Sequence, residues 1–375
     1  MAVMAEHSFR PSYVTPPGET IADLLDEHEM TQTELAKRLG VTLKHVNQVV
    51  KGGASISADL ALGLEKVFRV PAHFWLNRES LYQADVARRT EMSQLESHID
   101  WARAFPIKDL KKEGFLSKDA TGVELVQELL RFLGVATPAL WESRVAAYRR
   151  SQHYKSDQPA LDAWLRVGEL RAAAIECKRY DNERFVQALR KARALTHEHP
   201  RVWQPRITSA LAEAGVAFVI VDTFQGARAH GATRWLSPHK ALIQLSLRYR
   251  WEDVFWFSLF HEAAHVLLHR KKGIFVDGLE LAQSAALEDD RRLEDEANRF
   301  AARFLIPAEY EARLSSLRPS EIDAFADELG ITPAIVVGRL QHEGLIHFSE
   351  SKKWKRQLHF VETDEEGSRP QGRSG

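Results

Sequence analysis

The chain has 375 residues, of which 44% are apolar and 27% are charged, and its formal net charge is −1 at pH 7. This length is too great for one ordinary hydrophobic core and favours two or three domains with the composition of soluble globular proteins. The near-zero net charge excludes a general attraction to nucleic acids or anionic membranes, so any contact with DNA must come from a local surface.

Residues 15–89 are predicted to form a domain of short helices joined by tight turns. Thr31 begins a capping box, which predicts a helix over residues 32–39, and Thr42 caps a second helix over residues 43–50. Two short helices joined in this way are typical of a helix-turn-helix motif, which lays its second helix in the major groove of DNA. The sequence therefore predicts a DNA-binding domain, and a helical interaction domain without a DNA contact is the alternative.

The outer face of this predicted motif carries polar side chains that suit DNA. Their donors and acceptors can contact bases and phosphates. The expected DNA-binding residues are Gln32, Thr42, Lys44, His45, Asn47 and Gln48. Lys37, Arg38 and Lys51 add positive charge around the motif, whereas acidic residues crowd the first helix. This asymmetry favours a docked duplex.

Residues 90–206 are predicted to be a helical connecting region. Leucine, alanine and aromatic residues recur there at a spacing of three to four, as at Leu125, Leu129 and Phe132. This period indicates amphipathic helices, which we expect to pack as a small bundle. The region contains no motif that points to chemistry.

Residues 207–361 are predicted to form an α+β domain. Short apolar strands are expected over residues 216–221 and 241–247, and helices follow, one of them over residues 290–304. A further pair of helices is expected over residues 321–329 and 332–341, either as core packing or as a second DNA contact. The tail over residues 362–375 is polar and rich in Gly, Pro and Ser, so we expect it to be disordered. The predicted fold class is therefore mainly α with a small α+β domain.

The pattern His261-Glu262-Ala263-Ala264-His265 lies within a strongly apolar stretch that is predicted to be a buried helix. Its two histidines are one helical turn apart on one face, where their imidazoles can share a metal ion. Glu262 is rotated by about 100° from His261, so it can reach a water molecule that the metal activates and act as a general base. Without a third ligand, the same pattern would be an ordinary buried helix.

The third ligand is expected to be a carboxylate from a nearby helix, and Glu294 and Glu296 compete for this role. Glu294 shares a helical face with Ala297 and Asn298, and the small alanine allows another helix to approach closely. Glu296 is rotated by about 200° from Glu294, toward the expected solvent side, so Glu294 is favoured. Asn298 is expected to orient a ligand histidine through its second ring nitrogen. A structural zinc site without catalysis is the alternative.

The residue that would stabilise an oxyanion is not identified by these patterns. Tyr249, His269 and His347 are the candidates. The spacing of His269 from His261 is eight residues and does not match the metzincin pattern, so we interpret His269 as a residue at the helix C-terminus.

Residues 207–307, through the segments 231–238, 261–265 and 294–302, resemble the ImmA/IrrE family of metallo-endopeptidases. The resemblance implies a zincin-like fold with the metal arrangement of thermolysin, and an activity that cleaves helix-turn-helix repressors. It implies that His261, His265 and Glu294 bind Zn²⁺ and that Glu262 is the general base, a gluzincin-like set. Ala264 replaces the glycine that is common in this family.

The segment from Pro16 to Asn77 resembles Xre-type, HigA-like antitoxins. This resemblance implies a λ-repressor-like domain of five helices that binds palindromic, double-stranded operator DNA as a homodimer. Together the two resemblances predict a transcriptional regulator that carries a zinc endopeptidase, which cleaves a repressor or antitoxin-type protein or the chain itself. The alternative is a non-enzymatic antitoxin or transcription factor whose zinc domain is a sensor or an interaction module, for example for a cognate toxin.

The expected location is the cytoplasm. The single cysteine, Cys177, excludes an intrachain disulfide and a thiolate metal cluster, which fits a reducing compartment. The N-terminus lacks the pattern of a signal peptide. The most apolar stretch, residues 254–268, is too short to span a bilayer, so no membrane partner is expected.

Overall fold

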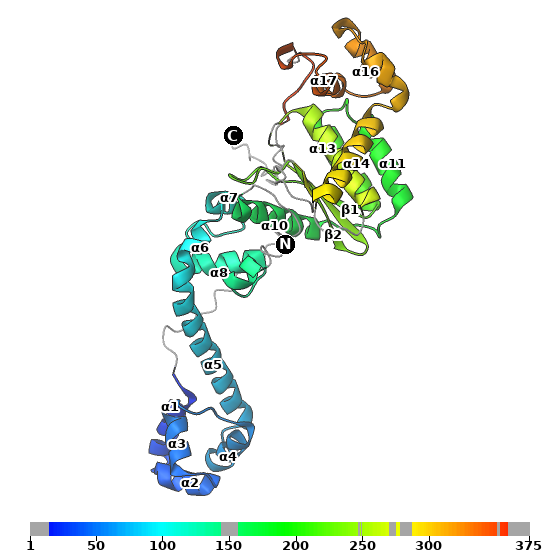
Figure 1. Cartoon of the computed structure of the whole chain (residues 1–375). Helices are drawn as coiled ribbons and strands as arrows, with labels where there is room; N and C mark the ends of the chain where they lie inside the picture. The colour runs from blue at the N-terminus through cyan, green and yellow to red at the C-terminus, as the bar shows by residue number, and fades with distance from the viewer. Residues whose placement is uncertain are drawn as a thin grey trace, which may run out of the picture. The chain divides into compact units, whose positions relative to one another are not determined.

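The computed structural model describes residues 15–143, 157–246, 248, 250–269, 275–277, 287–350 and 353–358. The chain divides into two units, residues 1–99 and residues 100–375, whose elements are labelled in Figure 1. The tail over residues 362–375, which was expected to be disordered, lies outside the described residues.

The described part of the N-terminal unit consists of five α-helices. They are α1 (Pro17–Glu27), α2 (Gln32–Leu39), α3 (Leu43–Val50), α4 (Ala58–Phe68) and α5 (Ala72–Leu95). The side chains of Thr31 and Thr42 cap α2 and α3, each accepting a backbone N–H bond of 3.2 Å. Gly18 allows α1 to approach α3, because a Cβ atom there would lie 2.2 Å from the carbonyl oxygen of Val50. The predicted five-helix domain is confirmed, and α5 continues beyond residue 89, where the sequence suggested a boundary.

One sheet of four strands lies in the described part of the C-terminal unit. The strands are β1 (Val216–Ile220), β2 (Gly231–Ser237), β3 (Lys240–Leu245) and β4 (Phe275–Asp277), in the order β1-β3-β2-β4. β1 runs parallel to β3, whereas β2 is antiparallel to both of its neighbours. The sequence predicted β1 and β3 but not β2 or β4.

The remaining described helices follow α5 in the chain, and α10, α12 and α13 among them contact this sheet (Figure 1). They are α6 (Ile99–Arg103), α7 (Ile107–Lys112), α8 (Gly122–Leu133), α10 (Gln158–Ala174), α11 (Asn182–Ala194), α12 (Pro200–Glu213), α13 (Glu252–Leu268), α14 (Leu287–Leu305), α15 (Glu311–Leu314), α16 (Ile322–Leu329) and α17 (Pro333–His342). Short 3₁₀ helices span Glu96–His98, Ala308–Tyr310, Pro319–Glu321 and Phe348–Glu350.

Helices that the sequence assigned to a separate bundle share their core with the sheet. α10 and α12 contact β1, and α11 packs against α12. Phe185 of α11 and Trp203 of α12 belong to the same hydrophobic cluster as Phe218 of β1. α12 runs through residue 206, where a domain boundary was expected.

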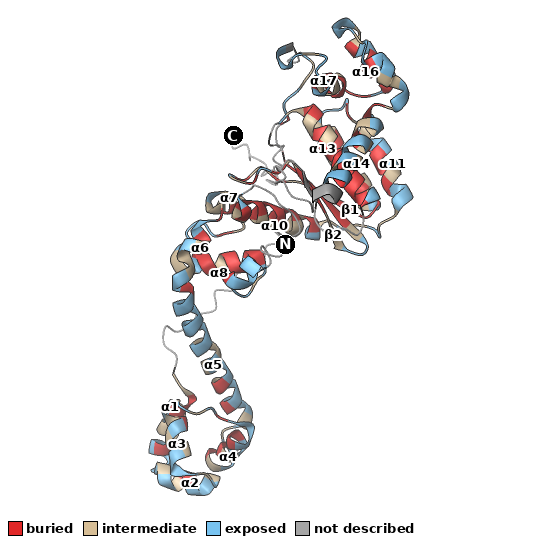
Figure 2. Ribbon diagram, in the orientation of Figure 1, coloured by how far each residue is buried: buried red, intermediate tan, exposed pale blue. Residues whose placement is uncertain are grey.

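α13 is the central helix of the C-terminal unit and contacts β2, β3, α14 and α17. Figure 2 shows it buried along most of its length. Phe255 and Trp256 are buried against Trp203, with ring centroids 4.8 and 5.1 Å away. A helix covered on all sides needs apolar residues on all faces, which explains the strongly apolar sequence around the histidine motif. Within the described residues, no helix is long and apolar enough to cross a membrane.

Candidate metal centre and helix-turn-helix surface

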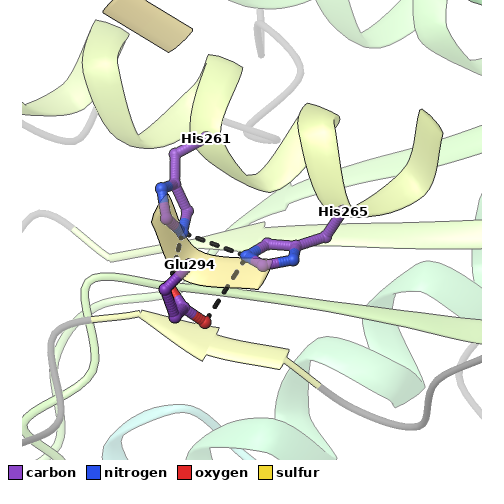
Figure 3. A group of neighbouring side chains, drawn as sticks. All are labelled: His261, His265 and Glu294. Atoms are coloured by element: carbon purple, nitrogen blue, oxygen red, sulfur yellow. Dashed lines mark hydrogen bonds and ion pairs between the residues drawn. The ribbon is translucent and has the colours of Figure 1, made fainter. Parts of the chain in front are cut away.

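Three side chains from two helices converge on one point in the C-terminal unit (Figure 3). His261 and His265 lie one turn apart on α13, and Glu294 faces them from α14. The Nε2 atoms of the two histidines are 3.0 Å apart, and the carboxylate of Glu294 lies 3.1 Å from His261 Nε2 and 3.7 Å from His265 Nε2. Both imidazoles are buried, whereas Glu294 is partly exposed.

Asn298 holds the ring of His261 from the other side. Its Oδ1 atom lies 2.9 Å from Nδ1 of His261. An amide oxygen can only accept a hydrogen bond, so the imidazole proton lies on Nδ1 and the Nε2 atom carries a lone pair. The structure thus brings Asn298 to the position in which the sequence predicted it.

His265 is held by a chain of two further residues. Its Nδ1 atom lies 3.0 Å from Nδ1 of His269, and Nε2 of His269 lies 3.1 Å from Oε2 of Glu296. The hydrogen bond from His269 lowers the pKa of Glu296, which keeps this carboxylate an acceptor. A neutral His269 that donates from Nε2 to this carboxylate accepts at Nδ1, and His265 then donates from Nδ1 and carries its lone pair on Nε2.

The donor set fits a divalent cation. Two Nε2 lone pairs and a carboxylate face each other, and the tautomers set by Asn298 and His269 leave no imidazole proton between them. Burial, followed by the nearby His261 and His269, lowers the pKa of His265 to about 2. Protonation of His265 therefore does not relieve the repulsion between the two lone pairs and the carboxylate. Two zinc ligands at their usual bond lengths lie about 3.3 Å apart in a tetrahedral site, close to the spacings observed here. Two imidazoles and one carboxylate, without a thiolate, form a ligand set that zinc takes in catalytic sites.

Glu262 lies between the histidines in sequence, and its side chain is fully buried. Thr233 of β2 donates a hydrogen bond of 3.0 Å to the backbone oxygen of Glu262. A Cβ atom at Gly231 would lie 2.5 Å from the Oε1 atom of Glu262, so only glycine leaves space for this carboxylate. The start of β2 therefore forms one wall of the site, a role that the sequence did not reveal.

The helix-turn-helix surface of the N-terminal unit places the expected DNA-binding side chains over a hydrophobic base. Leu35, Val46 and Val49 are buried beneath it. Thr42, Lys44 and Gln48 are exposed, whereas Gln32, His45 and Asn47 are partly buried. The amide of Asn47 donates to Oε1 of Gln32 over 3.3 Å, which joins α3 to α2. These two residues therefore also fix the angle between the helices.

Comparison with known families assigns both units. The family model for the IrrE N-terminal-like domain of M78 peptidases matches residues 239–341, and the helix-turn-helix model matches residues 21–75. Virulence-associated protein I of Dichelobacter nodosus is 32% identical over 78 residues, which are 20% of this chain and 72% of that protein. The chain belongs to the helix-turn-helix family and carries an IrrE-like peptidase domain.

Two further relatives match only part of this helix-turn-helix protein. A protein of Pyrococcus furiosus that is named as an HTH-type transcriptional regulatory protein is 31% identical over 98 residues. These residues are 26% of this chain and 30% of the Pyrococcus protein, so the chain covers less than a third of that relative. The structure of Pseudomonas aeruginosa antitoxin HigA with the higBA promoter is 33% identical, with a TM-score of 0.22. The match covers 23% of this chain and 96% of that one.

Three residues of the C-terminal unit were candidates for stabilising an oxyanion. Tyr249 lies outside the described residues. His347 has its Nδ1 atom 2.8 Å from Oγ of Ser349. His269 is the C-cap residue of α13, the helix-terminal position that the sequence suggested, and it is buried with its Nδ1 atom 3.0 Å from Nδ1 of His265. Its spacing of four residues from His265 was the available signal, because that spacing places two side chains on one helical face.

Proposed function

We propose that this protein is a DNA-binding transcriptional regulator whose IrrE-like domain is a zinc-dependent endopeptidase. The observation that carries the proposal is the convergence of His261, His265 and Glu294 on one point, with both imidazole lone pairs directed there. Three protein ligands leave a coordination position open, as catalytic zinc sites do, whereas structural sites are usually closed by four ligands. This supports catalysis over a purely structural role for the metal.

The bound zinc would supply a Lewis acid that polarises a peptide carbonyl and lowers the pKa of water. Glu262 would act as the general base, which accepts a proton from the attacking water and passes it to the leaving amine. The carboxylate of Glu262 lies between α13 and the Gly231 end of β2, and this close packing restricts its orientation. Asn298 and His269 keep the two imidazoles in the tautomer that binds a metal.

The N-terminal unit would bind double-stranded operator DNA through α3, as a homodimer on a palindromic site. Lys44 and Gln48 are exposed on α3, and Thr42 fixes the N-terminus of this helix. A positively charged and an amide side chain on one exposed helix provide a phosphate contact and a base contact. The substrate of the peptidase would be a repressor or antitoxin-type protein, or this chain itself.

The decisive experiment compares the wild-type full chain with Glu262→Gln and His261→Ala. We expect Glu262→Gln to keep zinc and operator binding but to lose proteolysis, measured as loss of intact substrate on gels and by mass spectrometry. His261→Ala should lose both zinc and proteolysis. Unchanged regulation in cells that carry Glu262→Gln would contradict the peptidase and favour a sensor or interaction module.

A further inference from the structure

A pocket of about 630 Å³ opens beside the candidate metal centre, between α13, α14 and α17. Asn298, which holds His261, forms part of its wall. Phe257 and Ser258 also line it, and they lie one turn before His261 on α13. The pocket and the metal centre therefore share the same two helices.

Part of the lining of this pocket is apolar. This part consists of Val254, Phe257, Ala302, Leu305, Ile306 and Ile335. Gly338 of α17 allows this helix to approach α13 closely beside the pocket, because a Cβ atom there would lie 2.7 Å from Oδ2 of Asp253. The volume falls within the range of about 300–1,000 Å³ that is typical of ligand pockets, so it exceeds the space of one side chain.

The charges around the pocket leave it selective for anions. Its two carboxylates are each paired, Asp253 with Lys355 and Glu343 with Arg339, with N–O distances of 2.5 Å. The other basic groups of the lining include Arg299 and His342, and among the described residues neither forms an ion pair. The Nε atom of Arg299 donates to the backbone oxygen of Asp295, and the charge of Arg299 contributes to the lowered pKa of Glu296. The terminal N–H groups of Arg299 can donate hydrogen bonds to a carboxylate.

We propose that this pocket binds the substrate segment next to the scissile bond and selects a bulky apolar residue that is followed or preceded by an acidic residue. The apolar side chain would lie against Phe257 and Ile335, and the carboxylate would bind Arg299. This inference rests on the proposed peptidase function and names the class of its substrate. A peptide is the fitting occupant because the pocket adjoins a site built to act on peptide bonds and exceeds one residue in size.

The test measures binding of short fluorescent peptides to the zinc-loaded Glu262→Gln full chain by fluorescence anisotropy. Four peptides differ only in one pair of residues, namely Phe-Glu, Phe-Gln, Phe-Lys and Ala-Glu. We expect Phe-Glu to bind at least about tenfold more tightly than Phe-Lys and Ala-Glu, with Phe-Gln between them. Arg299→Glu should reverse the preference between Phe-Glu and Phe-Lys. Arg303→Glu makes the same charge change on α14 outside the pocket and should leave the preference unchanged.

Filling the pocket supplies a second variant. Ala302→Trp should weaken binding of all three Phe peptides while retaining the zinc content of the parent protein, and if it loses zinc, Arg299→Glu decides alone. Equal binding of all four peptides would overturn the proposal, as would equally tight binding of N-acetyl-phenylalanine, which would mark a small-molecule site. If Arg299→Glu and Ala302→Trp cleave a substrate as well as the wild-type protein does, the proposed substrate pocket is contradicted and the proposed peptidase activity is not. Selective peptide binding without any cleavage by the wild-type protein would contradict the proposed peptidase activity but not the proposed pocket.

Discussion

The Nε2 atom of buried His269 lies 3.1 Å from a carboxylate oxygen of Glu296, and the other ring nitrogen of His269 contacts His265. Glu296 does not face the candidate metal centre, but its carboxylate still influences this centre through the imidazoles of His269 and His265. Because carboxylates only accept, a neutral His269 leaves one arrangement of protons along this chain, and it is the arrangement in which His265 can bind a metal. Glu294 and Glu296, which competed for one role in the sequence, have separate positions in the structure.

Removing the middle of this chain should weaken zinc binding. His269→Ala leaves Nδ1 of His265 without its acceptor, so we expect the zinc affinity to fall by about 10- to 100-fold, the usual effect of losing such a partner. Competition with a chromogenic chelator measures this affinity without any need for catalysis. His269→Gln, which can still accept at its amide oxygen, should recover part of the loss. Arg292→Ala, whose side chain lies 3.9 Å from Glu296, is the control and should have little effect.

Gly231→Ala tests the close approach of β2 to Glu262. The added methyl group would lie 2.5 Å from Oε1 of Glu262, so the carboxylate must move or the strand must shift. We expect a loss of about 1–3 kcal/mol in the free energy of unfolding and a larger loss of proteolysis than of zinc binding. Denaturant unfolding and metal analysis measure the two effects. Gly53→Ala, where the nearest atom would be 3.5 Å away, is the matched substitution and should be tolerated.

The metal-free protein should become less stable as the pH falls below about 6.5. Burial lowers the pKa of His265 from its ordinary value of 6.5 to about 2. The unfolded chain therefore binds this proton first, and the folded state loses stability progressively between these two pH values. Thermal unfolding in the presence of a chelator, at pH 7.5, 6.5 and 5.5, should show a steeper decline for wild type than for His265→Ala. Parallel declines in the two proteins would contradict the assigned pKa.

Operator binding should depend on Lys44 through charge and on Thr42 through helix stability. Lys44→Ala removes an exposed cation from α3, so the slope of log affinity against log salt should fall by about one. Thr42→Ala removes the cap of α3 and should cost about 0.5–2 kcal/mol of the free energy of unfolding. Anisotropy titrations at several salt concentrations separate the effects, with Lys66→Ala on α4 as the control. If the slope of log affinity against log salt is unchanged in Lys44→Ala, the prediction that the duplex contacts Lys44 is contradicted.

Much of this structure was predicted from local patterns in the sequence. The caps at Thr31 and Thr42 predicted the starts of α2 and α3, and the spacing of Glu294 from Asn298 predicted their shared face. These features depend on a few neighbouring residues, so the sequence contains them directly. The mainly helical fold class with a small α+β part was predicted for the same reason and is confirmed.

Features that depend on distant partners could not be predicted in this way. β4 has only three residues and exists through its pairing with β2. The sequences of α10 and α12 show which residues are apolar but not which surface covers them, so the sheet was missed as their partner. Glu296 has an exposed side and lies 27 residues from His269, and nothing in either local pattern connects the two.

The three metal-facing side chains differ in their access to solvent, since Glu294 is 21% exposed and each imidazole only 1%. An ion that arrives from solution would meet the carboxylate first and exchange its remaining water for nitrogen ligands afterwards. Capture would thus be ordered, with oxygen before nitrogen, and departure would follow the opposite sequence. Glu294 would then govern how fast the ion enters and leaves, while the sealed imidazoles would govern how tightly it is kept.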